Sequence, residues 1–296
     1  MLALLLTGCE GHQQVANHQL LVVDGENVTE NLTPTVALLK ADGFGGFYTY
    51  CSGVLIAPDF VLTAAHCHRE DLPLQEYRVA ARTAFPDHDG AMLVEVAKVH
   101  THPGYNPKAM LRRQDGLFIP GNAGDLALWN LKDSVSTDGI PRVAIPQDLN
   151  GYLSEGNHFL VMGFGKKSQW ESDWVKAQLA QAVLPYFETS EQMSVSSDNF
   201  VERIVKRSGK VTVNNRSEHE IFLGGAGYPD TCKGDSGGPV FFYPSKIAMD
   251  KVELIALTSR GTSHCRGGGL YSLAAPNLPW VRKTIGYQRF ERLVSP

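Results

Sequence analysis

The chain has 296 residues, of which 43% are hydrophobic and 20% are charged, and its formal net charge is −4. This length allows one large domain or two small ones, and the composition is that of an ordinary soluble globular protein. The small negative charge gives no reason to expect nucleic-acid binding, so we expect no nucleic-acid partner. The composition gives no sign of an oligomer, and we expect a monomer.

The first residues form an apolar run that ends at Cys9 and is too short to span a bilayer. Residues 6–9, Leu-Thr-Gly-Cys, resemble the lipobox of a bacterial lipoprotein signal, which predicts that Cys9 is lipidated and attaches the protein to a membrane. No Lys or Arg precedes the run, so a remnant of an ordinary signal peptide is the alternative. A cysteine that falls there by chance is the remaining reading. We expect export from a bacterial cell, as a secreted protein or as one anchored to the cell envelope by its lipid. Residues 1–21 would then lie outside the fold as a signal segment and a tether or propeptide.

Short apolar runs recur through most of the chain, separated by Pro, Gly, Asn and Asp. Short strands with regular turn signals predict an all-β barrel or sandwich. A helical pattern appears near the C-terminus, where Val281 and Ile285 share a face, Pro279 lies in the first turn and Asn277 is placed to cap the helix. The polar stretch 187–220 predicts long surface loops. Strands are expected at 35–39, 54–56, 61–62, 92–97, 126–129 and 159–162.

Residues 230–239, Asp-Thr-Cys-Lys-Gly-Asp-Ser-Gly-Gly-Pro, place Ser236 among three glycines. Glycine permits left-handed backbone angles and the close approach of another chain. A serine in such a turn is suited to attack a substrate carbonyl while nearby N–H groups point at the same place. Because an isolated serine is a poor nucleophile, the stretch predicts a histidine that takes the proton and a carboxylate that orients that histidine.

Two upstream motifs supply candidates for these partners. His66 follows a strand-like run in the sequence Thr-Ala-Ala-His-Cys, where the small alanines leave room around the ring. Asp125 begins the apolar run Asp-Leu-Ala-Leu. Taken alone, His66 is better explained as a buried structural histidine and Asp125 as a turn residue. Three other acids rank below Asp125 because no apolar strand follows them: Asp87, Asp89 and Asp115.

Together the three motifs resemble the trypsin-like, chymotrypsin-fold family of serine proteases, and they occur in that family's order of His, Asp and Ser. The resemblance extends over residues 22–285. It implies an all-β peptidase domain at 22–296, built from two packed six-stranded antiparallel β-barrels with a C-terminal helix and a catalytic cleft between the barrels. It also implies a serine endopeptidase that needs no cofactor and no metal. The expected partners are a protein or peptide substrate, an activating protease and a protein inhibitor.

The resemblance assigns a role to each residue of the motifs. Ser236 attacks the scissile carbonyl, His66 takes its proton and passes it to the leaving amine, and Asp125 orients His66. The backbone N–H groups of Gly234 and Ser236 form the oxyanion hole. The alternative function is binding without catalysis: a non-catalytic or latent homologue that binds protein through the same cleft.

The cysteines also match the family, which pairs the positions of Cys51 with Cys67 and of Cys232 with Cys265. Two such bridges leave Cys9 alone among the five cysteines and imply an oxidising compartment. A metal site is the alternative use of these residues, but no C-x-x-C or H-x-x-x-H pattern is present.

Substrate preference is implied by Asp230, six positions before Ser236. In the family this position is the floor of the primary pocket, where an acid selects Arg or Lys in the substrate. A surface turn acid, with a different pocket preference, is the alternative. The family's substrate-pairing segment corresponds to Ser259, Arg260 and Gly261, and Gly269 would leave the pocket mouth open.

Arg260 departs from the family, which usually has tryptophan at this position. Lys233 lies at the expected rim of the pocket. Two cations beside the cleft predict a preference for acidic residues next to the cleaved Arg or Lys.

A second departure concerns activation. In the family a new amino terminus enters the interior and pairs with the acid before the nucleophile, which is Asp235 here. Val22 stands at the matching place, but Leu20 and Leu21 precede it, with no Lys or Arg for tryptic self-cleavage. Three outcomes stay open: another protease cuts after Leu21, the uncleaved chain is only weakly active, or Asp235 finds a different donor.

Overall fold

The computed structural model describes residues 25–86, 91–111, 113–114, 117–166, 178–187, 216–224, 228–243, 250–261, 265 and 267–295. The expected lipidation site Cys9, the expected new terminus Val22 and the acids at 87, 89 and 115 lie outside these residues. Most of the polar stretch 187–220 also lies outside them.

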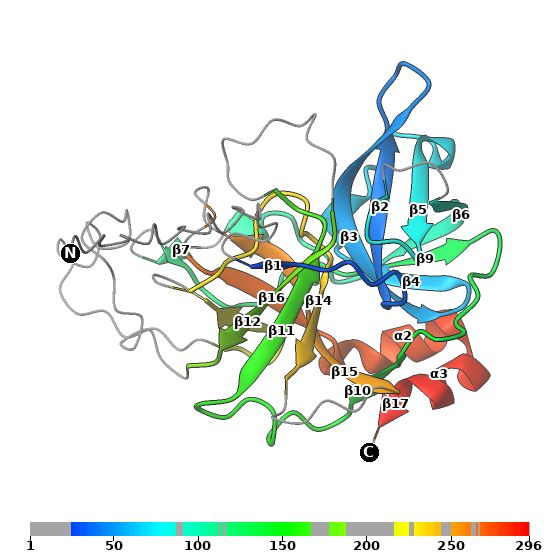
Figure 1. Cartoon of the computed structure of the whole chain (residues 1–296). Helices are drawn as coiled ribbons and strands as arrows, with labels where there is room; N and C mark the ends of the chain where they lie inside the picture. The colour runs from blue at the N-terminus through cyan, green and yellow to red at the C-terminus, as the bar shows by residue number, and fades with distance from the viewer. Residues whose placement is uncertain are drawn as a thin grey trace, which may run out of the picture.

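The N-terminal half forms a closed antiparallel barrel in the strand order β2-β3-β4-β9-β6-β5 (Figure 1). Its interior is filled by apolar side chains that include Leu38, Val79 and Val96. Trp129 packs edge-on against Tyr77 with 5.3 Å between ring centroids. The six strands are β2 (Thr35–Ala41), β3 (Phe47–Ala57), β4 (Phe60–Thr63), β5 (Tyr77–Ala81), β6 (Met92–Thr101) and β9 (Ala127–Leu131).

The C-terminal half forms a nine-stranded sheet in which six strands pair in the succession β12-β11-β14-β15-β16-β13. All six contribute to one core, with Phe159, Leu184, Ile221, Val240 and Tyr271 fully buried. Within the described residues no pairing joins β12 to β13. The strands are β1 (Glu26–Asn27), β10 (Arg142–Pro146), β11 (His158–Gly163), β12 (Ala180–Pro185), β13 (Glu220–Leu223), β14 (Pro239–Phe242), β15 (Lys251–Gly261), β16 (Gly269–Leu273) and β17 (Val294–Ser295).

The predicted all-β architecture is confirmed. The first half is the expected six-stranded barrel, whereas the second half is a nine-stranded sheet without closure among the described residues. This sheet also differs locally from a purely antiparallel one. Strand β10 pairs in parallel with both β15 and β17, so this edge of the sheet is not antiparallel. A two-stranded hairpin of β7 (Arg113–Gln114) and β8 (Leu117–Phe118) lies outside both sheets.

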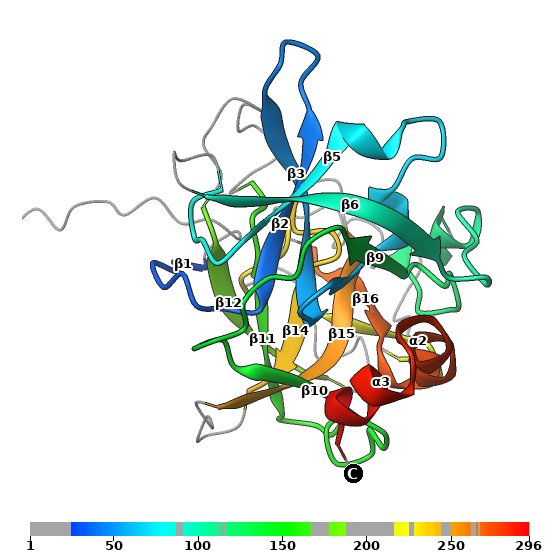
Figure 2. The same cartoon turned by 90° about the vertical axis from the view of Figure 1, so that its right-hand side faces the viewer.

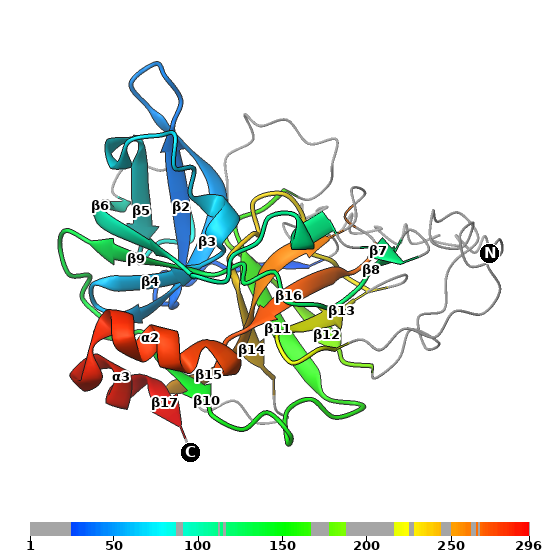
Figure 3. The same cartoon turned by 180° about the vertical axis from the view of Figure 1, so that it is seen from behind.

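Two short helices, α2 (Leu278–Ile285) and α3 (Tyr287–Leu293), follow the last long strand and lie beside the first barrel (Figures 2 and 3). The predicted helix is confirmed, and its apolar face buries Val281 and Ile285. Asn277 precedes the helix but does not cap it, because its amide donates to the Leu273 carbonyl at 2.7 Å. No described helix is long and apolar enough to cross a membrane.

The two halves meet along a further cluster of buried side chains. Leu62 and Leu128 from the first barrel pack in this cluster with Leu257 of β15 and Val281 of α2. Because the strands bearing the histidine and aspartate motifs belong to the barrel and the serine motif leads into β14, this junction brings the three motifs together.

Candidate active site

His66 lies in a single 3₁₀ turn, Ala65–Cys67, directly after β4. The disulfide between Cys67 and Cys51 of β3 fixes the end of this turn to the barrel. The neighbouring alanines are almost fully buried, while His66 is partly exposed. The small residues of the motif therefore let the turn pack tightly and leave the imidazole facing the junction between the halves.

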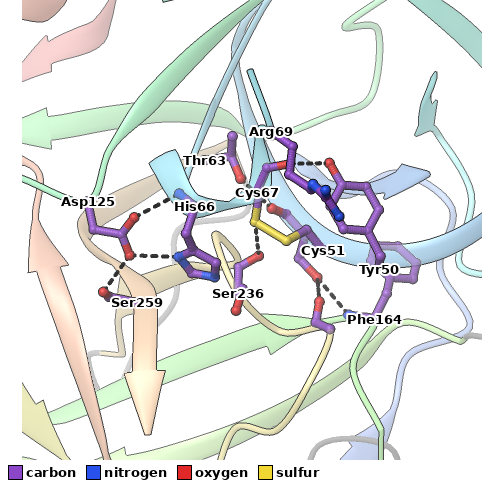
Figure 4. The surroundings of a disulfide bond; sticks show 12 residues. Tyr50, Cys51, Thr63, His66, Cys67, Arg69, Asp125, Phe164, Ser236 and Ser259 are labelled. Carbon is purple, nitrogen blue, oxygen red and sulfur yellow. Dashed lines mark hydrogen bonds and ion pairs between the residues drawn. A yellow bond between two sulfur atoms is a disulfide. The ribbon is translucent and has the colours of Figure 1, made fainter. Parts of the chain in front are cut away.

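Asp125 is fully buried and holds His66 through two hydrogen bonds (Figure 4). Its Oδ1 accepts the backbone N–H of His66 at 3.0 Å, and its Oδ2 lies 2.9 Å from His66 Nδ1. Ser259 Oγ donates to the same Oδ2 at 2.6 Å. Burial alone would raise the pKa of Asp125, but the charge of His66 and the hydrogen bonds from His66 and Ser259 outweigh burial and hold the pKa below its usual value.

Ser236 occupies a tight turn held from both halves of the molecule. Its carbonyl accepts the N–H of Ser52 in β3 at 2.8 Å, and the next N–H, of Gly237, donates to the Thr258 carbonyl of β15 at 2.7 Å. Gly237 has φ +79°, and a Cβ there would lie 2.0 Å from Thr63 Oγ1. Any side chain at Gly237 would therefore push the turn away from the barrel.

Two backbone donors near Ser236 have no acceptor among the described residues. Gly234 has φ +101°, and a Cβ there would lie 2.8 Å from Gly165 Cα. No described residue accepts the N–H of Gly234 or of Ser236. Figure 4 places Ser236 beside the imidazole of His66, on the side away from Asp125. The Ser236 hydroxyl-bearing turn, with these two backbone N–H groups, therefore lies beside the imidazole of His66.

Asp230 lies in the segment leading to Ser236 and is fully buried. Its carboxylate accepts the N–H of Thr231 at 2.8 Å and the N–H of Gly268 at 3.0 Å. Burial raises the pKa of Asp230 to about 7. The disulfide between Cys232 and Cys265 holds this segment against the chain that leads into β16. The burial of Asp230 therefore excludes the alternative that this residue is an acid in a surface turn.

Asp235 is fully buried, and both of its carboxylate oxygens accept backbone N–H groups. Gly165 donates to Oδ1 and Cys232 donates to Oδ2, each at 2.8 Å. Burial raises the pKa of Asp235 to about 7. Among the described residues the carboxylate has no cationic partner.

The expectation of two free cations beside the cleft is wrong for one of them. Arg260 Nη1 and Nη2 donate to the two carboxylate oxygens of Glu220 at 2.8 and 2.9 Å. The side chain of Arg260 is 8% exposed and that of Glu220 is 1% exposed. Lys233 is exposed. The buried Glu220 therefore neutralises Arg260. Of the two expected cations, only Lys233 presents its charge to solvent.

Two glycines of the expected substrate-binding segment face each other across strands. Gly261 of β15 pairs with Gly269 of β16.

Glu220 was not predicted as a functional residue from the sequence. It ends a polar stretch that predicted a loop, and no local pattern links it to Arg260.

One group of metal-ligating residue types is present among the described residues. Ligand atoms of Cys51, His66 and Cys67 lie within 4.8 Å of one another. Both sulfurs are joined in the disulfide, so neither is the thiolate that a metal ion requires.

Comparisons with known proteins agree with this geometry. The family model described as Trypsin matches residues 22–281. "Chymotrypsin-like elastase family member 1" of Homo sapiens is 25% identical over 286 residues, covering 93% of this chain and 97% of the relative. "CLIP domain-containing serine protease HP8" of Bombyx mori is 28% identical over 268 residues, covering 84% of this chain and 65% of the relative. These relatives come from animals, so the bacterial origin expected from the lipobox-like segment stays a prediction. A closed barrel, a second sheet, two disulfides and a match over most of its length show that the chain belongs to the trypsin family of serine proteases.

Proposed function

We propose that the chain is an endopeptidase that hydrolyses peptide bonds after Arg or Lys through a Ser236, His66 and Asp125 triad. The observation that carries this proposal is the buried Asp125 carboxylate 2.9 Å from His66 Nδ1, with Ser236 on the other side of the ring. The experiments that test the triad are developed in the Discussion.

The hydrogen bonds of His66 support one direction of proton transfer. Since His66 Nδ1 faces Asp125 and donates to it, Nε2 is the nitrogen that accepts the Ser236 hydroxyl proton. The Ser236 oxygen forms a bond to the substrate carbonyl carbon, and the carbonyl electron pair moves onto its oxygen. The imidazolium then protonates the departing amine, which leaves an acyl group on Ser236. Water, deprotonated by His66, releases the acid and restores the serine.

The developing oxyanion is stabilised by the N–H groups of Gly234 and Ser236. Both lack a partner among the described residues, as a site that awaits an oxygen requires. A donor of this kind contributes about 3 kcal/mol to lowering the barrier. The rival proposal, a homologue that only binds protein, explains neither the free donors nor the ordered Asp125–His66 pair.

Asp230 is proposed as the acid that selects a cationic side chain. Asp230→Ser is expected to lower kcat/KM for arginyl substrates by about 100-fold or more, because a buried charge-assisted pair is lost. The measurement compares arginyl, lysyl and leucyl peptides of otherwise identical sequence. The matched control, Asp133→Ser, changes an exposed acid and should leave the preference unchanged. An unchanged preference for Arg and Lys in Asp230→Ser would contradict the pocket assignment.

We further propose that a cut after Leu21 by another protease supplies an ammonium group at Val22 that pairs with Asp235. In a chain without that cut, the buried Asp235 and Asp230 have pKa values of about 7, above the usual value of 3.8. At pH values between the usual pKa and the raised pKa, the folded state binds more protons than the unfolded state. The free energy of unfolding therefore falls as the pH rises from about 4 to 7.

This prediction is checked by urea denaturation at several pH values on the uncut chain and on a chain that begins at Val22. The loss of stability toward pH 7 should be smaller in the chain that begins at Val22, because an ammonium partner favours the ionised carboxylate. Equal slopes for the two chains would show that Asp235 does not pair with the new terminus.

The two disulfides support folding in an oxidising compartment, and we propose that the protein is exported. Residues 1–21 serve as the signal and tether, with Cys9 as the lipidated residue, and 22–296 as the peptidase domain. The expected partners are a protein or peptide substrate, an activating protease and a protein inhibitor. The matched relative "Phenoloxidase-activating enzyme" of Bombyx mori, 26% identical, is named for an activating role of its own.

A further inference from the structure

The buried pair of Glu220 and Arg260 is linked through Ser259, by two successive hydrogen bonds, to the carboxylate that holds His66. Arg260 Nη1, besides its bond to Glu220, donates to Ser259 Oγ at 3.3 Å. Ser259 Oγ in turn donates to Asp125 Oδ2 at 2.6 Å. A chain of polar contacts therefore runs from Glu220 through Arg260 and Ser259 to Asp125.

Arginine fixes the direction of the hydrogen bonds in this chain. A guanidinium donates and never accepts, so the Ser259 oxygen must accept from Arg260. The single hydroxyl hydrogen of Ser259 is then directed at Asp125. Without Arg260 the hydroxyl could rotate, and the third hydrogen bond to the Asp125 carboxylate would no longer be enforced.

Glu220 also holds the segment that carries Asp125. Its Oε2 accepts the N–H of Gly121 at 2.7 Å, and its Oε1 accepts the N–H of Ala123 at 3.4 Å. The neighbouring Ser217 Oγ donates to the Gly121 carbonyl at 2.6 Å. Glu220 belongs to β13 of the second sheet, whereas Asp125 lies two residues before the barrel strand β9. One carboxylate therefore ties the approach to Asp125 to the opposite half of the molecule.

The charges in this group are arranged so that the Arg260 guanidinium does not compete with His66 for the Asp125 carboxylate. Glu220 engages Arg260 through two parallel bonds, which neutralises the guanidinium. An unneutralised guanidinium at this place would attract the Asp125 carboxylate and weaken its interaction with the imidazolium that forms during catalysis.

We propose that Glu220 and Arg260 are positioning residues that align Asp125 and Ser259 from the second sheet for the proposed triad reaction. The proposal rests on the proposed function, because it assigns these residues to the same reaction. It replaces the expected role of Arg260 as a cation that attracts acidic substrates.

The test compares Glu220→Gln, Arg260→Met, Arg260→Lys and the double variant Glu220→Gln/Arg260→Met. The matched control is Asp59→Asn, which breaks a bidentate pair with Arg289 on the surface. Circular dichroism and thermal unfolding establish that each variant is folded. Turnover is measured on a small arginyl ester that occupies only the primary pocket and on a longer arginyl peptide.

Glu220→Gln is expected to lower kcat about tenfold or more on both substrates, because a misplaced Asp125 misaligns His66, while KM changes little. Arg260→Met should lower kcat similarly. Arg260→Lys should lower it less, because lysine keeps the positive charge but cannot form the two parallel hydrogen bonds of the guanidinium. The double variant should lose less than the product of the two single losses, since the residues act as one unit. Asp59→Asn should retain wild-type kcat.

Two kinetic outcomes would overturn the proposal. An unchanged kcat on the ester, with a raised KM only on the longer peptide, would make the pair a substrate-binding element. A lower melting temperature with unchanged kcat and KM in the folded variants would make it a structural pair only.

A spectroscopic readout separates this proposal from the proposed function. The proton shared by His66 Nδ1 and Asp125 is expected to give a far-downfield NMR signal whether or not the chain turns over substrate. Glu220→Gln should shift or broaden that signal, and Asp59→Asn should not. If the wild-type chain beginning at Val22 shows no turnover, the proposed function fails, and an unchanged signal in Glu220→Gln would separately overturn the positioning role.

Discussion

Ser236→Ala is expected to lower kcat by about a million-fold, because this removes the hydroxyl that we propose forms the acyl intermediate. The free N–H groups near this residue stay in place, so a weak residual activity above the reaction in water should persist. KM should change little, because the proposed primary pocket at Asp230 is untouched. Initial-rate kinetics on an arginyl ester give both parameters.

Ser154→Ala is a suitable control for this variant. Its hydroxyl donates only to the Asn150 carbonyl on an exposed loop. The control should retain wild-type kcat. If Ser236→Ala kept more than a small fraction of the wild-type kcat, the nucleophile would have to be another group.

Asp125→Asn is expected to lower kcat by about ten-thousand-fold with little change in the fold. The direction of this effect follows from the hydrogen bonds. The backbone N–H of His66 requires an oxygen at the Oδ1 position, so the amide nitrogen of asparagine must take the Oδ2 position, facing His66 Nδ1. Nδ1 then accepts, and the imidazole carries its hydrogen on Nε2, where it cannot take the proton of Ser236.

The control for this variant is Asp59→Asn, the same chemical change at a half-exposed surface pair. Pre-steady-state kinetics on the ester should show that acylation is the step that slows in Asp125→Asn. A variant whose acylation rate matched that of wild type would contradict the assignment of Asp125 as the carboxylate that orients His66.

The parts of the site that were predictable from sequence are those that local chemistry determines. The turn that presents Ser236 needs glycine at Gly237, because a Cβ there would lie 2.0 Å from Thr63. Because this requirement for glycine affects consecutive residues, the motif can be recognised without a structure. The small residues before His66 are equally local. The order of the three motifs then indicated the two-part β fold.

The parts that were not predictable depend on partners distant in the chain. Arg260 is separated from Glu220 by 40 residues, and their pairing depends on the meeting of β13, β15 and β16. Viewed alone, Arg260 is a free cation and Glu220 is a loop residue. Asn277 likewise carries the local signal of a helix cap, but its buried amide satisfies the Leu273 carbonyl instead.

The most direct test of the account is stoichiometric labelling with a fluorophosphonate, which forms a phosphorus–oxygen bond with an activated serine and releases fluoride. The labelled protein is a chain beginning at Val22, and peptide mass spectrometry locates the label. The account predicts one equivalent of label on Ser236, with labelling much slower in Asp125→Asn. A folded chain that takes no label, or takes it on a residue other than Ser236, would contradict the account.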